Sequence, residues 1–561
     1  MLNEHCQIEC LDCGFRTPYH PLETTCPHCG GMWRKAVYDY TYLSRALPPR
    51  LKERPFDLWR YRELLPVTQP TPELRLSEGG TPLIRALNLG MMLGLANIFM
   101  KDERQGPTSS FKDRQAALSI SALKTVGVRE VVLASTGNVA IAYSAYAARA
   151  GIKLWAFLTS LVPAAKMREV ALYGTQVIKV TGSYDQAKQV AAEFARQRGI
   201  YLDAGARSIA NIESMKTIAY EIAEQLGEVL NNSDNPVSSG QPRWQAPDWY
   251  IQAVSGGMGP LGVLKGFREM YEMGWIDKIP KIGVIQVEGC APMVNAWKQG
   301  RETAIPVQSP RTNIATLATG DPGRTYTLLR NGMLEGSGGA FEAVSDEEAF
   351  RAIHFLAKME GMSVEPAAAV ACAGLIKLVR SGQIKPHEVV VMNISGHTLP
   401  VERAVVGDGW SRNVVVSEAI HAGAEEGLLA ALSKITIDRF PRIAIVDDHP
   451  EARRLIRRIL QSQGEYTLYE AASGREAIEL AQREHPDLII LDLMMPEIDG
   501  FGVIEALQAQ PETADIPIIV VTAKELTPAE KDRLRGHIQS LMQKGDFMSD
   551  DLLDEVRALL K

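Results

Sequence analysis

The sequence lacks a long uninterrupted apolar run. Its longest stretch without a charged residue, 131–148, is interrupted by Ser135, Thr136, Gly137 and Asn138, whereas a helix that crosses a bilayer needs about 20 mostly apolar residues. The first residues, Met-Leu-Asn-Glu-His-Cys, show no basic stretch followed by an apolar one, so no secretory leader is expected. These absences predict a cytoplasmic protein with no membrane partner.

The sequence also has little excess of positive charge. Of the 561 residues, those at 440–561 include 14 Lys and Arg against 23 Asp and Glu, a net charge of −9, which leaves +2 for the rest of the chain. Neither part is basic enough for nucleic acid to be an expected partner. The asymmetry instead indicates a separate acidic module at the C-terminal end, in a chain whose length predicts three to four domains.

Cysteine is scarce except at the N-terminus. Five of the seven cysteines fall within the first 29 residues, and four of them form two CxxC pairs separated by twelve residues: Cys10, Cys13, Cys26 and Cys29. Four thiolates at this spacing are typical of a structural zinc site with no open position for water. Disulfides are the alternative, which a reducing compartment disfavours, and His28 or Cys6 could replace one of the four zinc ligands. Residues 1–40 therefore resemble a zinc ribbon.

The central part of the chain, 76–405, alternates β-branched runs with Ala-rich stretches, which predicts an α/β fold with parallel sheets. Here Lys112 opens an expected helix beside Phe111. A lysine at a helix N-terminus and next to an apolar side chain should have a lowered pKa, which suits Schiff-base chemistry. A glycine-rich turn after a strand, at 253–259 (AVSGGMG), offers backbone N–H groups to a phosphate.

Five motifs of this central part occur in an order and spacing that resemble the threonine synthases, which are fold type II pyridoxal-phosphate enzymes. They are 78–83 (EGGTPL), 107–114 (PTSSFKDR), 134–138 (ASTGN), 213–221 (ESMKTIAYE) and 365–367 (EPA). The resemblance covers 76–405 and implies a two-lobed domain that binds pyridoxal 5'-phosphate and acts on an amino acid. Because relatives of this fold are commonly dimers, it also implies a homodimer.

The same resemblance implies roles for individual residues. Lys112 is expected to form the Schiff base with the cofactor and to move protons, Asn138 to contact the ring hydroxyl of the cofactor, and Ser395 to face its pyridine nitrogen. The cofactor phosphate is expected to lie against Ser255, Gly256, Gly257, Met258 and Gly259, and the substrate carboxylate against Ser135, Thr136 and Gly137.

Several positions depart from the family pattern. Where the family's Asn and Arg for the substrate phosphate are expected, this chain has Ser208 and Asn211, which removes a guanidinium that could bind phosphate bidentately. The adjacent Arg207 starts from a different backbone direction. His397 and the residues after it also replace the family's usual Gly-Leu-Lys-Asp. The expected substrate is O-phosphohomoserine, with β-elimination or replacement on another amino acid, as in threonine or serine dehydratases, as the alternative.

After an expected linker at 406–439, three strands of the acidic module end in polar residues. Asp447 and Asp448 follow one strand, Asp492 the second, and the third ends in Thr522. Since the carboxyl ends of parallel strands meet at one edge of a sheet, these carboxylates should lie together, where Mg²⁺ is the natural counter-ion.

Residues 440–561 resemble a response-regulator receiver domain with a flavodoxin-like fold. The resemblance implies phosphorylation of Asp492 by a sensor histidine kinase, with Asp447, Asp448, Asp492 and the Met494 carbonyl as magnesium ligands. Thr522 and Lys544 would contact the phosphoryl oxygens. Leu541 and Gly545 replace the usual switch aromatic and the proline after the lysine, so the route of the signal is left open.

Three functions follow from the sequence. The first is a pyridoxal-phosphate lyase of threonine synthase type that is regulated through Asp492. The second is a non-catalytic signalling protein in a two-component pathway, and the third is a zinc-ribbon adaptor. The retained Lys112, Asn138 and glycine loop favour the first.

Overall fold

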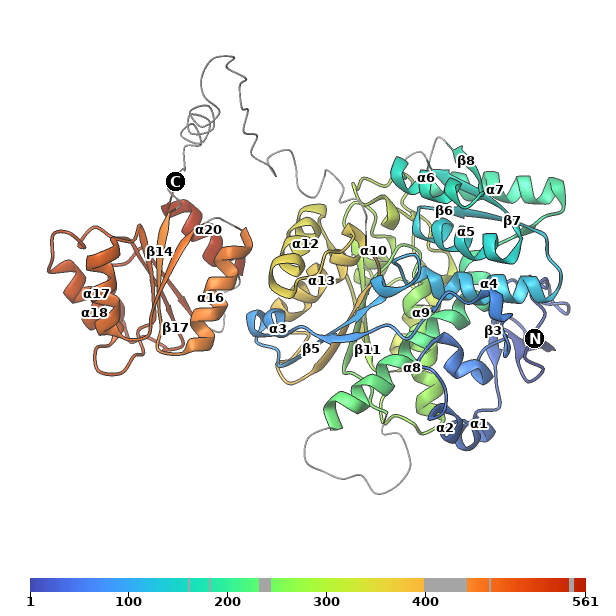
Figure 1. Cartoon of the computed structure of the whole chain (residues 1–561), viewed down its shortest axis with the longest axis horizontal. Coiled ribbons are helices and arrows are strands. Elements are labelled where there is room, and N and C mark those ends of the chain that lie inside the picture. The colour runs from blue at the N-terminus through green and yellow to red at the C-terminus, as the bar shows by residue number, and fades with distance from the viewer. Residues whose placement is uncertain are drawn as a thin grey trace, which may run out of the picture. The chain divides into compact units, whose positions relative to one another are not determined.

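The computed structural model describes residues 1–159, 162–180, 183–231, 244–336, 338–397, 441–463, 466–543 and 549–560. The chain divides into two compact units (Figure 1). The first comprises 1–86, 96–353 and 363–402, and the second comprises 87–95, 354–362 and 403–561. The expected linker at 406–439 lies outside the described residues.

The N-terminal part of the first unit is a small antiparallel sheet in the order β2-β1-β3. Its strands are β1 (Gln7–Cys10), β2 (Arg16–Pro18) and β3 (Arg34–Val37), and Gln7 pairs with both Pro18 and Val37. Short helices follow: α1 (Tyr40–Ala46), α2 (Pro48–Leu51), and the 3-10 turns η1 (Leu58–Leu64) and η2 (Pro72–Leu74).

The larger lobe of the first unit is built on a six-stranded sheet in the order β12-β11-β10-β13-β5-β4, parallel except for the β4–β5 pair. The strands are β4 (Leu83–Arg85), β5 (Asn97–Asp102), β10 (Trp249–Ala253), β11 (Lys281–Val287), β12 (Gly339–Val344) and β13 (Val389–Ile394). Every residue of β10 is buried, as expected of a central parallel strand covered on both faces. The helices and turns of this lobe are η3 (Glu103–Gln105), α8 (Ile209–Asn231), α9 (Met258–Glu272), α10 (Pro292–Lys298), η5 (Ala315–Leu317), α11 (Arg324–Glu335), α12 (Asp346–Glu360) and α13 (Pro366–Arg380).

The smaller lobe is a four-stranded parallel sheet in the order β8-β7-β6-β9. It contains β6 (Glu130–Ser135), β7 (Lys153–Thr159), β8 (Gln176–Val180) and β9 (Tyr201–Leu202), with α4 (Lys112–Thr125), α5 (Asn138–Ala150), α6 (Ala164–Leu172), α7 (Tyr184–Arg198) and η4 (Gly205–Arg207). Figure 1 shows α5, α6 and α7 gathered around these strands. The predicted α/β fold with parallel sheets is confirmed.

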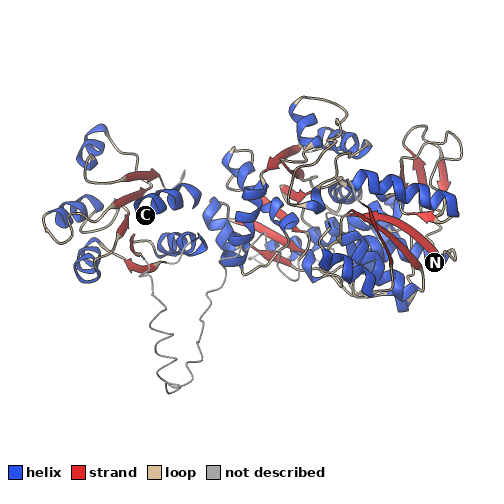
Figure 2. Ribbon diagram, turned by 90° about the horizontal axis from the view of Figure 1, so that it is seen from above, coloured by secondary structure: helices blue, strands red, loops and turns tan. Residues whose placement is uncertain are grey.

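The second unit contains a five-stranded parallel sheet in the order β15-β14-β16-β17-β18, which is the predicted flavodoxin-like order. Its strands are β14 (Arg442–Val446), β15 (Thr467–Ala471), β16 (Leu488–Leu491), β17 (Ile518–Thr522) and β18 (Ser540–Gln543). The helices are α16 (Pro450–Gln463), α17 (Gly474–Glu484), α18 (Gly500–Gln508), α19 (Pro528–Leu534) and α20 (Ser549–Leu559), and α3 (Leu87–Leu93) belongs to the same unit. Helices cover both faces of this sheet (Figure 2), with α17 and α18 packed on one face and α16 and α20 on the other.

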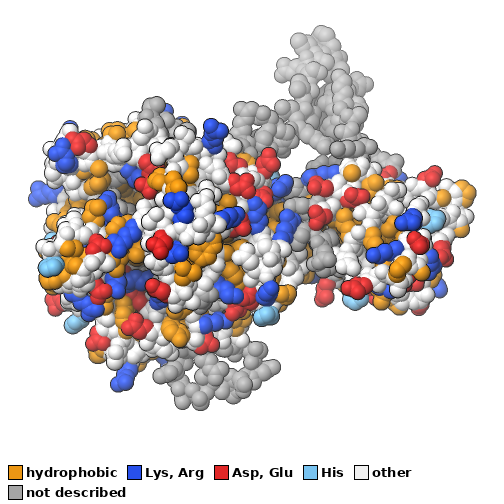
Figure 3. Space-filling view, turned by 180° about the vertical axis from the view of Figure 1, so that it is seen from behind, with side chains coloured by type: hydrophobic (Ala, Val, Ile, Leu, Met, Phe, Trp, Pro, Cys, Tyr) orange, Lys and Arg blue, Asp and Glu red, His pale blue; other side chains and the backbone are white. Residues whose placement is uncertain are grey.

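Acidic and basic side chains are interspersed over the face of the molecule that Figure 3 shows. Among the helices that the structure describes, none combines the length and apolar character needed to span a bilayer.

Candidate functional sites

Lys112 is the first residue of α4 and is partly buried. Its Nζ lies 4.1 Å from the centroid of the Phe111 ring. Burial lowers the pKa of Lys112 to about 8, even though the carboxylates of Glu365 and Asp203 act to raise it. About half of the amine is therefore deprotonated at pH 8, and the lowered pKa agrees with the sequence prediction.

The loop before α4 is held in a fixed shape by its own polar groups. The Asp113 carboxylate accepts hydrogen bonds from the Thr108 backbone N–H at 2.9 Å and from the Thr108 hydroxyl at 2.7 Å. The Phe111 N–H donates to the Ser395 carbonyl oxygen at 3.0 Å, so Ser395, which is buried, lies next to the start of α4. Ser110 Oγ is buried and has no hydrogen-bond partner in the described part of the chain, so a bound molecule could supply one.

Behind Lys112 lies a buried network of charges that joins three of the sequence motifs. Arg114 binds Glu103 at 2.8 Å and Glu221 at 2.6 Å, and Lys101 binds Glu221 at 2.7 Å; these side chains are almost fully buried. Although burial opposes it, the charges of Arg114 and Lys101 lower the pKa of Glu221 to about 2. Thr81 of the EGGTPL motif donates to Glu103 at 2.8 Å. These motif residues fix α4 against β5 and α8.

A second cluster of polar side chains lies on the side of α5 and α13. The Asn138 amide donates to both Glu365 oxygens, at 2.8 and 3.0 Å, and its carbonyl accepts from Lys166 Nζ at 3.0 Å. Lys166 also pairs with Glu365 at 3.2 Å. A Cβ on Gly396 would lie 2.9 Å from Glu365 Oε1, so glycine leaves room for this carboxylate. Sequence reasoning missed Lys166, because no local pattern marks a lysine in the first turn of α6.

The glycine turn of 255–259 joins β10 to α9, as predicted. Gly257 has a φ of +82°, and a Cβ there would lie 2.7 Å from Met293 Cε, so no other residue fits without a shift. Because Met258 is the first residue of α9, backbone N–H groups of this helix start are free of intrahelical partners. The Ser255 and Thr319 hydroxyls are hydrogen-bonded.

The turn after β6 lies close to 316–319, the segment that contains Thr319. The Thr136 hydroxyl donates to the Thr316 carbonyl at 3.4 Å, so 316–319 contacts both predicted binding loops. Ser135 Oγ accepts hydrogen bonds from the N–H groups of Gly137 at 3.0 Å and Ala140 at 3.1 Å. The side chain of Ser135 thus caps the start of α5, and Gly137 has a φ of +138°, a backbone conformation that favours glycine.

An acidic residue, Asp203, follows β9 and acts on the pKa of Lys112. Asp203 accepts from the Tyr143 hydroxyl at 2.6 Å, the Asn211 amide at 3.0 Å and the Gly205 N–H at 2.9 Å. Burial raises its pKa. Asn211, at the position where the family's arginine is expected, is fully buried in this network, and Arg207 Nη1 instead lies 3.2 Å from Met32 Sδ.

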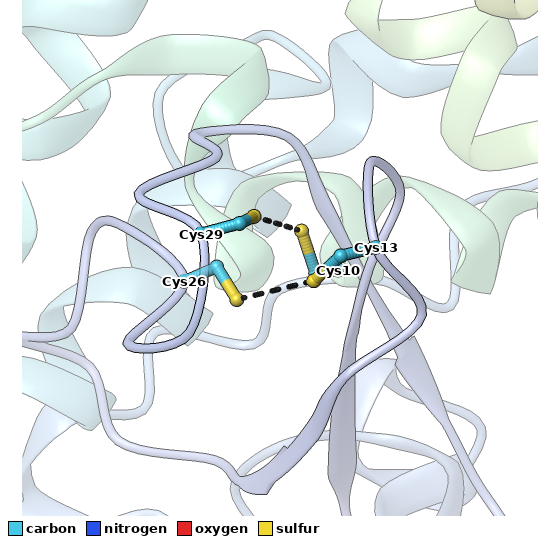
Figure 4. Close-up of side chains that lie close together, drawn as sticks. All are labelled: Cys10, Cys13, Cys26 and Cys29. Atoms are coloured by element: carbon cyan, nitrogen blue, oxygen red, sulfur yellow. Dashed lines mark hydrogen bonds between the residues drawn. The ribbon is translucent and has the colours of Figure 1, made fainter.

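The four N-terminal cysteines come together (Figure 4), with their sulfurs all within 4.8 Å of one another. The Sγ atoms of Cys10 and Cys29 are 3.6 Å apart, and those of Cys13 and Cys26 are 3.7 Å apart. Four sulfurs placed tetrahedrally at the zinc–sulfur bond length are separated by about 3.8 Å. The donor set therefore fits zinc in both chemistry and spacing.

In the second unit, the predicted acidic residues lie at the carboxyl ends of neighbouring strands. Asp447 and Asp492 follow β14 and β16 and are buried, and Thr522 ends β17 and is fully buried. The N–H of Met494 donates to Asp492 Oδ1 at 3.2 Å. A Cβ on Gly500 would lie 2.5 Å from the Asp492 carbonyl oxygen, so this glycine allows α18 to pack beside the acidic loop.

His449 adds to this acidic group and was not singled out in the sequence. Its Nδ1 lies 2.7 Å from Asp448 Oδ1, and Asp447, Asp448 and His449 could together hold a metal ion. Leu541 lies in β18 and is partly exposed. Lys544 and Gly545 lie outside the described residues.

Comparison with known proteins identifies both units. A family model for pyridoxal-phosphate dependent enzymes matches residues 74–396, more than half of the chain. The chain belongs to this family. The chain is 35% identical over 392 residues to a threonine synthase of Methanocaldococcus jannaschii, and the match covers 70% of this chain and 92% of the relative. It is 32% identical over 400 residues to a threonine synthase of Methanosarcina acetivorans, and that match covers 71% of this chain and 93% of the relative. A model for the response regulator receiver domain matches residues 443–557.

A solved structure of diaminopropionate ammonia lyase from Escherichia coli has a TM-score of 0.50 at 16% identity, covering 62% of this chain and 96% of the other, and it supports the fold alone.

The family models and the sequence relatives together show that the chain is a pyridoxal-phosphate lyase with a receiver domain, as the sequence predicted. The lowered pKa of Lys112, the glycine cradle at Gly257 and the unpartnered Ser110 hydroxyl fit the family's cofactor.

Proposed function

We propose that Lys112 holds pyridoxal 5'-phosphate and moves protons during elimination from an amino-acid substrate. The observation that carries this proposal is a partly buried lysine with a pKa of about 8 at the start of α4. When bound, the cofactor withdraws electrons from the substrate Cα. Ser395, whose hydroxyl is neutral, would face the pyridine nitrogen and keep that withdrawal mild, which suits elimination more than transamination.

The remaining predicted residues would bind the two anionic groups at this site. Ser255, Gly256, Gly257, Met258 and Gly259 form the start of α9 and suit the cofactor phosphate. The backbone of Ser135, Thr136 and Gly137 suits the substrate carboxylate. Asn138, held between Glu365 and Lys166, would contact the ring hydroxyl, and these two neighbours would fix its amide orientation.

The leading reaction is that of the named relatives, in which O-phosphohomoserine and water yield threonine and phosphate. It is tested by measuring phosphate release and threonine formation by the cofactor-loaded enzyme, with Lys112→Ala as the inactive variant. Equal phosphate release by Lys112→Ala, or none by the wild type, would refute this reaction.

A second candidate is β-elimination from serine or threonine, which releases ammonia and a 2-oxo acid. Asn211 and Asp203 favour it, because the neutral Asn211 amide stands where the family's phosphate-binding arginine is expected and donates to the Asp203 carboxylate at 3.0 Å, and this carboxylate, when ionised, would repel a phosphate dianion. Ammonia and 2-oxo acid from serine or threonine, without phosphate from O-phosphohomoserine, would select this candidate. In that case Asp203→Asn should improve the enzyme's relative use of the phosphorylated substrate.

We further propose that a sensor histidine kinase phosphorylates Asp492 and that this controls the lyase. Asp447, Asp448, Asp492 and the Met494 carbonyl would hold Mg²⁺, which neutralises the charge of the transferred phosphoryl group, and Thr522 and Lys544 would contact its oxygens. Comparing lyase rates before and after phosphorylation tests this control; identical rates would contradict it. Cys10, Cys13, Cys26 and Cys29 would hold a structural zinc ion.

A further inference from the structure

A cavity of about 420 Å³ lies between the cysteine-containing N-terminal sheet and the smaller lobe. One wall comes from 19–34, and the other from α7, β9 and η4. This volume is within the range of cavities that bind small molecules. Neither the proposed reaction nor the proposed zinc site uses it.

The lining combines an apolar wall with arginines. The apolar surface comes from Ala192, Ala195, Ile200 and Leu202. The charged lining residues are three arginines, Arg34, Arg196 and Arg207, and one carboxylate, Glu23. Arg196 is already paired with Glu193 at 2.6 Å.

The other two arginines have no carboxylate within 4.0 Å among the described residues. Arg34 donates to the Glu23 backbone carbonyl, and its Nε is buried without a hydrogen-bond partner in the part of the chain that the structure describes. Within the described part of the chain, Arg207 donates a hydrogen bond only to Met32 Sδ, which is a weak acceptor. Two guanidinium groups with no described carboxylate within 4.0 Å therefore line this cavity from its two walls.

We propose that this cavity binds a small anionic effector that carries a carboxylate or phosphate group and an apolar body. The anionic group would bridge Arg34 and Arg207, since a guanidinium binds such oxygens bidentately, and the apolar body would pack against Ala192 and Ile200. None of the residues proposed to hold the cofactor or the substrate carboxylate lines this cavity, although Ser208, at the position of the family's phosphate-binding asparagine, does.

The position of η4 connects this site to the active site. Arg207 ends η4, and the first residue of that turn, Gly205, donates its N–H to Asp203 at 2.9 Å and accepts from the Asn211 amide at 3.0 Å. An effector that draws Arg207 toward Arg34 therefore acts on the turn that holds Asp203.

The test uses 4-fluorophenyl phosphate, observed by fluorine NMR with the full chain loaded with pyridoxal phosphate so that the cofactor site is filled. The probe should bind saturably, whereas 4-fluorophenol, which lacks the anion, should not. Arg207→Gln and the cavity-filling Ala192→Leu should each raise the Kd at least tenfold. Arg351→Gln, at an exposed arginine of α12, should leave it within twofold.

Retention of the cofactor absorbance verifies that each variant is folded. Absence of saturable binding to the wild type would overturn the proposal. So would an unchanged Kd in both Arg207→Gln and Ala192→Leu, because the probe would then bind elsewhere. Since the readout is binding, its outcome is independent of which substrate the enzyme uses.

Discussion

The environment of Lys112 predicts how cofactor attachment depends on pH. Only the deprotonated amine attacks the aldehyde of the cofactor. With a pKa of about 8, half of Lys112 is deprotonated at pH 8, whereas a lysine of ordinary pKa would be deprotonated in about one molecule in 300. Burial thus raises the reactive fraction about 150-fold at that pH.

The assay is rapid mixing of apoprotein with pyridoxal phosphate over a series of pH values, following the absorbance of the bound cofactor. The rate should rise with pH and level off above a midpoint near pH 8. Nα-acetyl-lysine under the same conditions corrects for titration of the cofactor itself and should show no such midpoint. Because Glu365 acts to raise the pKa of Lys112, Glu365→Gln should move the midpoint to lower pH, while Arg351→Gln should not. A wild-type midpoint at the ordinary lysine value would refute the reasoning.

The remaining predictions concern the other sites. Acetyl phosphate with Mg²⁺ should label the wild type and Asp515→Asn but not Asp492→Asn; equal labelling of all three would contradict the assignment. The purified protein should contain one zinc ion per chain, lost in Cys13→Ser and kept in Cys290→Ser, and zinc retention in both would exclude the four-cysteine site. Glu221→Gln leaves buried Lys101 without its ion-pair partner and Arg114 with Glu103 alone, and it should lower the free energy of unfolding of the first unit by about 3–5 kcal/mol, measured with denaturant; a loss no larger than that of the exposed Glu193→Gln would contradict this.

Features that depend on neighbouring residues could be predicted from the sequence. The alternation of strands and helices, the glycine turn before α9 and the position of Lys112 at a helix start follow from local propensity and spacing. The ends of parallel strands also brought Asp447 and Asp492 to one edge, because topology alone determines that edge.

Side-chain partners far apart in sequence could not be predicted in the same way. Asn138 and Glu365 are 227 residues apart, and Lys166 joins them from a third element. Likewise Glu213 accepts from Tyr38 at 2.9 Å and pairs with Lys265 of α9 at 3.0 Å inside the core. Such pairs depend on how the lobes pack, and local hydrophobic patterns carry no signal for them.

The position of Asp203 shows the same limit for specificity. The sequence indicated that the family's phosphate-binding arginine is absent, but not that Asn211 is enclosed by Asp203 and Tyr143. Asp203, whose carboxylate acts to raise the pKa of Lys112, follows a two-residue strand, and sequence periodicity does not reveal so short a strand.

The central claim is that the cofactor is bound to Lys112, and reduction with borohydride followed by peptide mass spectrometry tests it most directly. The account predicts a pyridoxyl-phosphate adduct on Lys112 in the wild type and none in Lys112→Ala. An adduct on a different lysine, or the same adduct yield in Lys112→Ala, would contradict it.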